Sequence, residues 1–458
     1  MDLDQPLVSS TPTNNTYQVI QSVFFMVAFS TGLGILGSAY TLTRFHINSL
    51  LAEFLIMLFI LVSYMFSHHM IAYCCRESSQ KYNFAEYLED RLGKVAAMAY
   101  DILLSIHNVV LLSYIQFFVA HFMVETDESV GNADRAYYFL AVVNIPLIFF
   151  SLTGDFKRNK WFCVGMLIIW LYVFIGKSIE TSKNCSADQY WDDFPINGND
   201  EFGTWIIKLI GLQLYFASAF QSVPFIYKEV KKQRIMNKVI NWGAIYVLLV
   251  YLTVYVFYTF DPNSIIEDIE ESEEIDDWAE ISNITIALDD DEFNCKAIGG
   301  YSHLIDYGRV LIGACGIIVN VIPARFALSQ FLSGNDSENM KKVSGSDKLL
   351  TAVLIMVSII LALFMFNKTF WGVTVCLGVI LSSILGILVP TVAVLFTEEY
   401  SVLLFKKNLS TNTKNKNKYP LLNTSDLGKK IFIFTYLVWA IILTLLGITS
   451  GFFILIDP

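Results

Sequence analysis

The first apolar segment of the chain contains the run Ser30-Thr31-Gly32-Leu33-Gly34-Ile35-Leu36-Gly37. Three glycines within six residues disfavour a continuous helix, because each costs about 1 kcal/mol relative to alanine in a helix interior. A membrane tolerates an interrupted helix only where protein buries the free backbone groups or where they line a cavity. The run also matches the G-x-G-x-x-G dinucleotide pattern, but no strand precedes it, which excludes that interpretation. We therefore expect a half-helix whose N–H groups point toward an anion.

The composition is that of a polytopic membrane protein. Of 458 residues, 55% are hydrophobic and only 16% are charged, whereas soluble proteins average about 25% charged. The mean hydropathy is +0.52. Segments long enough to cross about 30 Å of hydrocarbon recur along the chain. They predict eleven transmembrane helices, at 19–43, 49–75, 95–124, 136–153, 160–179, 204–228, 238–260, 302–332, 348–366, 370–397 and 430–456. We expect one polytopic domain, 19–458, after a disordered tail, 1–18.

The charges of the loops predict the orientation. Cations follow the even-numbered spans: Arg76, Lys81, Arg91 and Lys94; Lys157, Arg158 and Lys160; Lys228, Lys231, Lys232, Arg234 and Lys238; Lys341, Lys342 and Lys348; and Lys406, Lys407 and five further lysines up to Lys430. The positive-inside bias then places the N-terminus in the cytosol. The net charge of −11 is concentrated in the loop 261–301, which this topology places outside. We expect a solvated loop there, and no nucleic-acid partner.

Two of the seven cysteines fall in the predicted outer loops. Cys185 and Cys295 are therefore expected to form a disulfide bond, since that compartment is oxidising. The sequon at Asn283 lies on the same side and predicts a glycan. If the bond is present, mass spectrometry of the unreduced protein will find one peptide pair that joins the two cysteines. Two free thiols would contradict the prediction.

A second interruption is predicted in the sixth span, at Ser218-Ala219-Phe220-Gln221-Ser222-Val223-Pro224. Proline removes an N–H and clashes with the carbonyl four residues back, so the helix should open near Phe220. Interruptions in the first and sixth spans are expected if 19–180 and 204–397 are inverted repeats, with 430–456 as an extra helix. The alternative is that the small residues serve close packing between helices.

Several motifs resemble the amino acid/auxin permease family, most closely its sodium-coupled neutral amino acid transporter branch. They are the glycine run extended to Tyr40, Phe225-Ile226-Tyr227-Lys228-Glu229, Asp306-Tyr307-Gly308-Arg309, Pro323-Ala324-Arg325 and Gly386-Ile387-Leu388-Val389-Pro390. The resemblance implies an all-α, leucine-transporter-like membrane fold. That fold has a five-plus-five inverted repeat with discontinuous helices one and six, an eleventh helix, and an amino acid bound at mid-membrane.

The chain departs from this branch where sodium would bind. Ala28 stands where sodium-coupled members have asparagine, and 314–316 stand where they have threonine. Phe220-Gln221 replaces the His-Pro pair common in the sixth span. These side chains offer Na⁺ no oxygen ligands, so we expect transport that is coupled to H⁺ or uncoupled. His107, inside the third span, titrates in the useful range and is the candidate proton relay.

The predicted substrate site lies between the first and sixth spans. The half-helix near Gly32 and Gly34 would hold the carboxylate of an amino acid, and opened carbonyls with hydroxyl and amide groups would hold its ammonium. The side chains proposed for the site are Ser30, Thr31, Ser218 and Gln221, with Asn108, Phe220 and Asn320 facing the same cavity. The alternative role for these polar groups is hydrogen bonding between helices.

Nothing in the sequence indicates an enzyme. It contains no Ser/His/Asp spacing and no H-E-x-x-H, C-x-x-C or G-x-x-x-x-G-K motif, so we expect no catalytic residues, metal centre or cofactor. The sequence predicts a secondary transporter, or symporter, of neutral or polar amino acids in the plasma membrane or an endolysosomal or vacuolar membrane. The alternative is an amino-acid-binding sensor with little flux.

Overall fold

The computed structural model of the chain describes residues 16, 18–30, 50–78, 84–125, 136–152, 156–184, 202–230, 232–259, 301–333, 345–398 and 426–456. Every regular element in these ranges is a helix, as expected for apolar segments that must satisfy their own backbone hydrogen bonds in lipid. The predicted disulfide, glycan and glycine run lie outside the described residues and remain predictions.

Apart from the first predicted span, of which the structure describes only the part up to Ser30, the helices follow the predicted spans to within about five residues. In chain order they are Gln18–Ser30, α2 (Leu50–Glu77), α3 (Phe84–Leu92), α4 (Lys94–Glu125), α5 (Ala136–Leu152), α6 (Phe156–Asn184), α7 (Phe202–Phe216), η3 (Phe220–Ser222), α8 (Val223–Val230), α9 (Gln233–Thr259), α12 (Tyr301–Ser333), α13 (Gly345–Phe364), α14 (Lys368–Ser383), η5 (Ile384–Leu388), α15 (Val389–Glu398) and α17 (Asp426–Ile456). The element η3 is a 3₁₀ turn and η5 is a π-helical turn.

Eight stretches of the described residues are long and apolar enough to cross a membrane, which makes the chain a multi-pass membrane protein. They lie in α2, α4, α7 to α8, α9, α12, α13, α14 to α15 and α17. The predicted count of eleven is not confirmed. Within the described residues, the helix Gln18–Ser30 and the apolar part of α6, Trp161–Gly176, are shorter, and α5 has 17 residues.

The short helix α3 was not predicted. It is amphipathic: Phe84, Ala85, Tyr87 and Leu88 are buried, and α3 packs against α2, α4 and α15. Gly93, with φ of 90°, then separates α3 from α4 in the left-handed conformation that glycine adopts most readily. The predicted orientation counted the cations between the second and third spans as loop charges. One of them, Arg91, lies on the packed helix α3.

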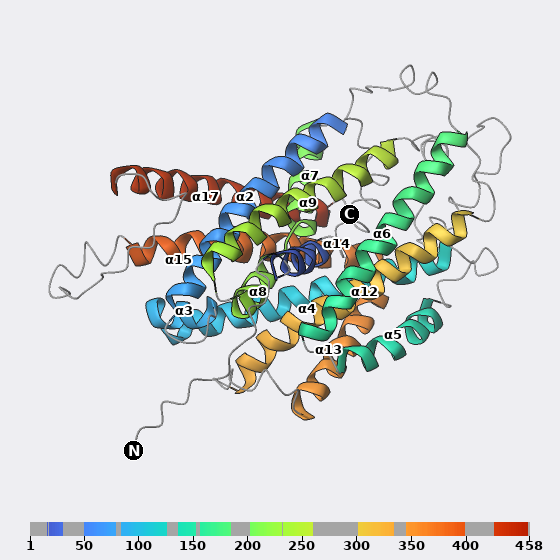
Figure 1. Cartoon of the computed structure of the whole chain (residues 1–458), viewed down its shortest axis with the longest axis horizontal. Helices are drawn as coiled ribbons and strands as arrows, with labels where there is room; N and C mark the ends of the chain where they lie inside the picture. Colours follow the sequence, from blue (N-terminus) through green and yellow to red (C-terminus); the bar gives the residue numbers. More distant parts are fainter. Residues whose placement is uncertain are drawn as a thin grey trace.

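The helices form two groups, which Figure 1 shows on either side of the centre. In one group α2 packs against α7, α8 and α9; in the other α4, α5, α12 and α13 pack against one another. Helices five spans apart in the predicted order contact each other, namely α2 with α9, α4 with α12 and α5 with α13. These contacts are compatible with the predicted inverted repeat, which stays a prediction.

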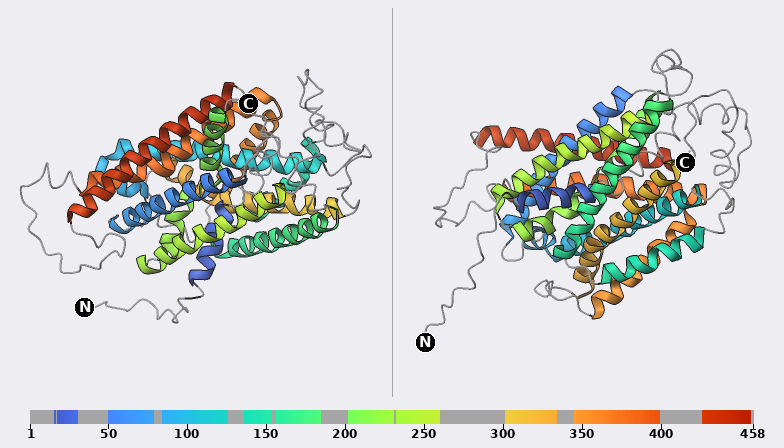
Figure 2. Two further views of the ribbon diagram at one scale, coloured as in Figure 1. Left: turned by 90° about the horizontal axis from the view of Figure 1, so that it is seen from above. Right: turned by 45° about the vertical axis from the view of Figure 1, so that its right-hand side comes forward.

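The last helix closes one side of the molecule. The helix α17 runs alongside α14, as Figure 2 shows, and also packs against α7. Small residues allow this close approach: a Cβ built on Gly447 would lie 2.8 Å from Ser383 Cβ, and one on Gly451 would lie 3.2 Å from Cys376 O. As a result α14 is held between α4 on one side and α17 on the other.

Candidate functional site

The sixth predicted span is interrupted where the sequence predicts it. The helix α7 ends at Phe216, residues 217–219 are not helical, and the chain resumes as η3 and α8. Ala217 N–H still donates to Gln213 O at 3.0 Å, but Ser218 N–H bonds only three residues back, to Tyr215 O. Because the α-helical pattern stops here, carbonyl groups of the last turn of α7 lose their helical donors.

Hydroxyl groups from three other helices cap these carbonyls. Tyr64 Oη on α2 donates to Leu214 O at 2.5 Å, and Tyr251 Oη on α9 donates to Phe216 O at 2.9 Å. Ser30 Oγ, at the end of the first described helix, donates to Ala217 O at 3.3 Å. An unpaired buried carbonyl costs about 1–3 kcal/mol, so these bonds stabilise the opened backbone. They also bring the first and sixth spans together.

A second irregular turn lies in the tenth predicted span, at η5. Val389 N–H donates to Ile384 O, five residues back, which is the π-helical pattern. Pro390 has no N–H to give to the carbonyl four residues back, that of Gly386. Ser67 Oγ on α2 donates to that carbonyl instead. One helix, α2, thus caps both irregular turns.

The two irregular turns contact each other through Gly386. A Cβ built on Gly386 would lie 2.8 Å from Tyr64 Cε1 and 2.9 Å from Phe220 Cδ1, both closer than real Cβ contacts. Only hydrogen at this position leaves room for the two rings. The tight fit means that a displacement of η3 and a rearrangement of η5 are mechanically linked.

The imidazole of His107 lies between the same two turns, from the α4 side. His107 Nε2 and Ser382 Oγ, two residues before η5, are hydrogen-bonded at 2.8 Å. The His107 ring is 5.1 Å from that of Phe220 and 6.1 Å from that of Tyr215, centroid to centroid. All four side chains are buried. The candidate site is therefore enclosed by α2, α4, the break between α7 and η3, and α14.

Two buried amides at or near this place have side-chain atoms without a hydrogen-bond partner in the described part of the chain. Both side-chain amide atoms of Gln221, on η3, lack a partner within the described part of the chain. Asn108 follows His107 in α4, and neither polar atom of its buried amide has a hydrogen-bond partner within the described residues. Buried polar groups are seldom left unpaired in folded proteins, so unpaired amides at an interrupted helix indicate a place for a polar solute.

The sequence-predicted site residues separate into three sets. Ser30, Ser218, Phe220 and Gln221 lie at the break, and Asn108 follows His107, whose ring contacts that of Phe220. The Nδ2 atom of Asn320 donates to Gly316 O of its own helix, and its Oδ1 is unpaired among the described residues, so none of its hydrogen bonds reaches the break. Thr31, Gly32 and Gly34 fall outside the described residues.

The residues that sequence reasoning missed are the caps, Tyr64, Ser67 and Tyr251, and the glycine at the π-turn, Gly386. One of them had a signal in the sequence. Pro390, four residues after Gly386, removes the donor for the Gly386 carbonyl and so marks an irregular turn. The tyrosines had none, because a tyrosine within an apolar span is equally compatible with a role in packing.

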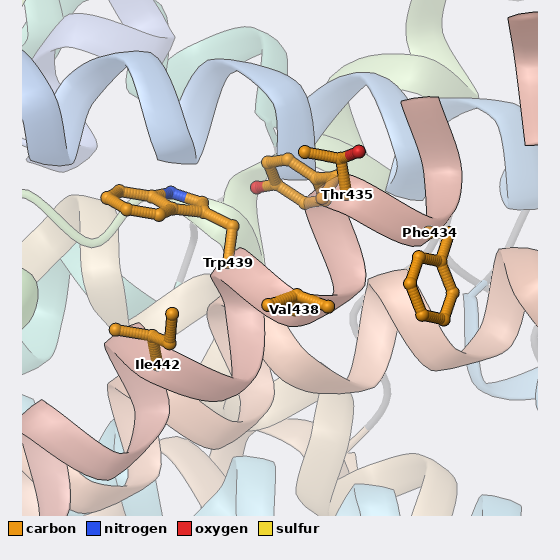
Figure 3. A pocket seen from close by; sticks show the side chains of 6 residues that line it. Phe434, Thr435, Val438, Trp439 and Ile442 are labelled. Carbon is orange, nitrogen blue, oxygen red and sulfur yellow. The ribbon is translucent and has the colours of Figure 1, made fainter. Parts of the chain in front are cut away.

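A pocket of about 430 Å³ lies elsewhere, on α17. Figure 3 shows its lining, which is Phe434, Thr435, Tyr436, Val438, Trp439 and Ile442. The polar atoms of its two largest residues are already used: Tyr436 Oη donates to Ser63 O and Trp439 Nε1 to Ser63 Oγ. An apolar pocket on one membrane-spanning helix offers nothing that would recognise a charged solute. We therefore place the candidate site at the break.

No protein-family model and no curated protein sequence matches the chain. The structure is similar to that of a manganese transporter from Eremococcus coleocola bound to an aromatic bis-isothiourea substituted compound. The TM-score is 0.56 at 11% identity, over 97% of this chain and 89% of the other. A single-residue mutant of the same transporter gives a TM-score of 0.54 at 10% identity, over 98% of both chains.

A Na⁺-coupled sialic acid symporter in a substrate-bound outward-open state gives a TM-score of 0.48 at 12% identity, over 95% of this chain and 94% of the other. At identities this low, the likeness to the manganese transporter shows a shared fold. The likeness extends over nearly the whole length of both chains, so the two proteins share the arrangement of their helices throughout.

Proposed function

We propose that the protein is a secondary transporter of amino acids, of the neutral or polar kind, that works by alternating access around the break in the sixth span. The observation that carries the proposal is this break, with its carbonyls capped from the first helix, α2 and α9 and with the unpaired amide of Gln221 beside it. Interrupted helices at matching positions mark the central site of many secondary transporters.

The chemistry at the break suits an amino acid better than a divalent metal. The polar groups described there include no carboxylate: they are the amides of Asn108 and Gln221, hydroxyls, and the imidazole of His107. Mn²⁺ prefers carboxylate and carbonyl oxygens, and the described residues contain no group of three His, Cys, Asp or Glu that could hold a metal. Amides instead offer a donor and an acceptor, which match the carboxylate and ammonium of a zwitterion.

The capped carbonyls change where the ammonium is expected to bind. We expected it to meet the opened carbonyls, but Leu214 O, Phe216 O and Ala217 O already accept hydroxyl hydrogen bonds. Among the described side chains of η3, Gln221 Oε1 is a buried oxygen without a hydrogen-bond partner. The proposal therefore assigns the ammonium to the Gln221 amide, while the carboxylate remains assigned to the N–H groups near Gly32, with one of its two oxygens left for the His107 side of the site.

The decisive experiment is flux in proteoliposomes. The purified protein is reconstituted, and uptake of each of the twenty radiolabelled amino acids is measured with and without an acid-outside pH gradient and with and without Na⁺. Manganese uptake is measured in parallel. We expect uptake of one or more neutral or polar amino acids that does not require Na⁺. Binding without flux under every gradient would support a sensor instead, and manganese uptake alone would overturn the proposal.

The glycine run gives a test that is independent of the described residues. A Gly34→Leu substitution is expected to abolish uptake while the protein still reaches the membrane, because the leucine side chain fills the space that a carboxylate needs beside the backbone. Uptake and surface labelling are measured on the same cells. Normal uptake by the variant would refute the placement of the carboxylate at this run.

A further inference from the structure

His107 is a titratable group buried at the centre of the molecule, and the proposed binding of an amino acid does not by itself use it. It lies near the middle of α4, is fully buried, and reaches both irregular turns, through Ser382 before η5 and through the Phe220 ring of η3. Its Nδ1 makes no geometrically sound hydrogen bond within the described residues. The ring therefore has one nitrogen anchored and one available.

No carboxylate of the described residues pairs with His107. The helices packed against α4 are α3, α5, α12, α13 and α14 with η5. The nearest titratable side chain from the break is Tyr215, in an edge contact. The other titratable or charged residues described on α4 and on these helices are of two kinds. Those on α3 or toward a helix end are Glu86, Tyr87, Glu89, Asp90, Arg91, Lys94, Tyr100, Asp101, Arg309, Arg325, Asp347, Lys348 and Lys368. The others are Tyr114, Cys315 and Cys376.

An imidazolium at this place would therefore lack a counter-charge from the described residues. An unpaired ion in a buried site is strongly destabilised, even after the surroundings relax. The hydrogen bond to Ser382 offsets only part of that cost. The proton is expected to stay only when an anionic group lies beside the ring.

We infer that His107 carries the coupling proton and that the carboxylate of the bound amino acid supplies the missing counter-charge. The inference rests on the proposed function and adds the coupling ion and the residue that holds it. A proton moves from water on one side to the imidazole, whose two nitrogens then both donate, and it returns to water on the other side. Because the proton and the carboxylate stabilise each other, each raises the affinity for the other.

The link between proton and solute predicts how binding responds to pH. If the charged imidazole stabilises the bound carboxylate, the dissociation constant of the amino acid falls as the pH falls. Between about pH 7.5 and pH 5.5 we expect wild-type affinity to rise by about tenfold or more, and the affinity of His107→Gln to change by less than about twofold. The amino acid used is the one with the highest flux in the proteoliposome screen.

The same two proteins are then compared in proteoliposomes that contain a pH-sensitive dye. Under an acid-outside gradient, the wild type is expected to accumulate the amino acid and to acidify the lumen when it is added. In His107→Gln, accumulation of the amino acid and acidification of the lumen are each expected to fall by about tenfold or more, since an amide cannot carry a proton at these pH values. The matched control is His68→Gln, a second buried histidine, on α2, which should keep the wild-type response to pH.

A positioning variant keeps the test decisive if His107→Gln does not fold. Ser382→Ala removes the oxygen that accepts a hydrogen bond from the protonated ring, so the acid midpoint of uptake should move to a lower pH. An unchanged midpoint overturns the inference. So does gradient-driven accumulation by His107→Gln at the wild-type level, which leaves the proposed function intact. Absence of any wild-type flux overturns the proposed function and the inference together.

Discussion

A Gly386→Ala substitution is expected to reduce amino acid flux by about tenfold or more, because inserting a methyl group into a packed core costs about 1–3 kcal/mol. The added Cβ would lie 2.8 Å from Tyr64 Cε1 and 2.9 Å from Phe220 Cδ1. Neither ring can simply turn away: Tyr64 is held by its hydrogen bond to Leu214 O, and Phe220 is completely buried. The clash must therefore displace η3 or η5. The measurement is initial uptake in proteoliposomes, normalised to reconstituted protein.

The matched control for this prediction is Gly165→Ala. Gly165 lies inside α6, and a Cβ built on it meets nothing within 4 Å. Alanine in a helix interior is favoured over glycine by about 0.5–1 kcal/mol, so this variant should be at least as stable as the wild type and should transport normally. If Gly386→Ala also transports normally, the contact between the two irregular turns has no role in transport.

Removal of the two tyrosine caps is expected to have a still larger effect. In the double variant Tyr64→Phe/Tyr251→Phe, the buried carbonyls of Leu214 and Phe216 lose the hydroxyl groups that bond them. Each unsatisfied carbonyl costs about 1–3 kcal/mol. We expect a lower melting temperature and flux reduced by about thirtyfold or more, since the opened backbone is the proposed site. The single variants should show intermediate losses.

The control for the caps is Tyr436→Phe. Its hydroxyl also donates to a backbone carbonyl of a neighbouring helix, Ser63 O, at 2.6 Å, but on the α17 side of α2 and away from the break. This variant should lower the melting temperature while it keeps transport. If Tyr436→Phe lost as much transport as Tyr64→Phe/Tyr251→Phe, the two tyrosine caps would act through overall stability alone and would not hold the site.

The sequence alone located the interruption in the sixth span to within a few residues. Pro224 and the small residues Ser218 and Ala219 act on their own stretch of backbone, so a local pattern is enough to predict where the helix opens. The same holds for eight apolar stretches that can cross a membrane, since hydropathy is a property of each segment. The amphipathic α3 was missed because a nine-residue helix in a charged loop gives a weak signal.

Only part of the residues that form the site could be predicted from the sequence. Ser30, Ser218, Phe220 and Gln221 were proposed from the interrupted spans and lie at the break, whereas Asn320 bonds within its own helix. The pairing of Ser67 with Gly386 joins residues 319 positions apart, and that of His107 with Ser382 joins residues 275 apart. A single sequence contains no information about such distant pairs.

Features that depend on a single segment of the chain could be predicted from the sequence, and features that depend on contacts between distant segments could not. A segment in lipid must satisfy its own backbone, so the amino-acid sequence by itself determined the membrane helices, their α-helical form and the place where proline and small residues open the sixth. Which groups cap the opened carbonyls depends on the faces that helices turn toward one another, and apolar helices of similar hydropathy can pack in many ways. Only the tertiary structure therefore decided that α2 and α9 hold the break open and that Gly386 brings the second irregular turn against it.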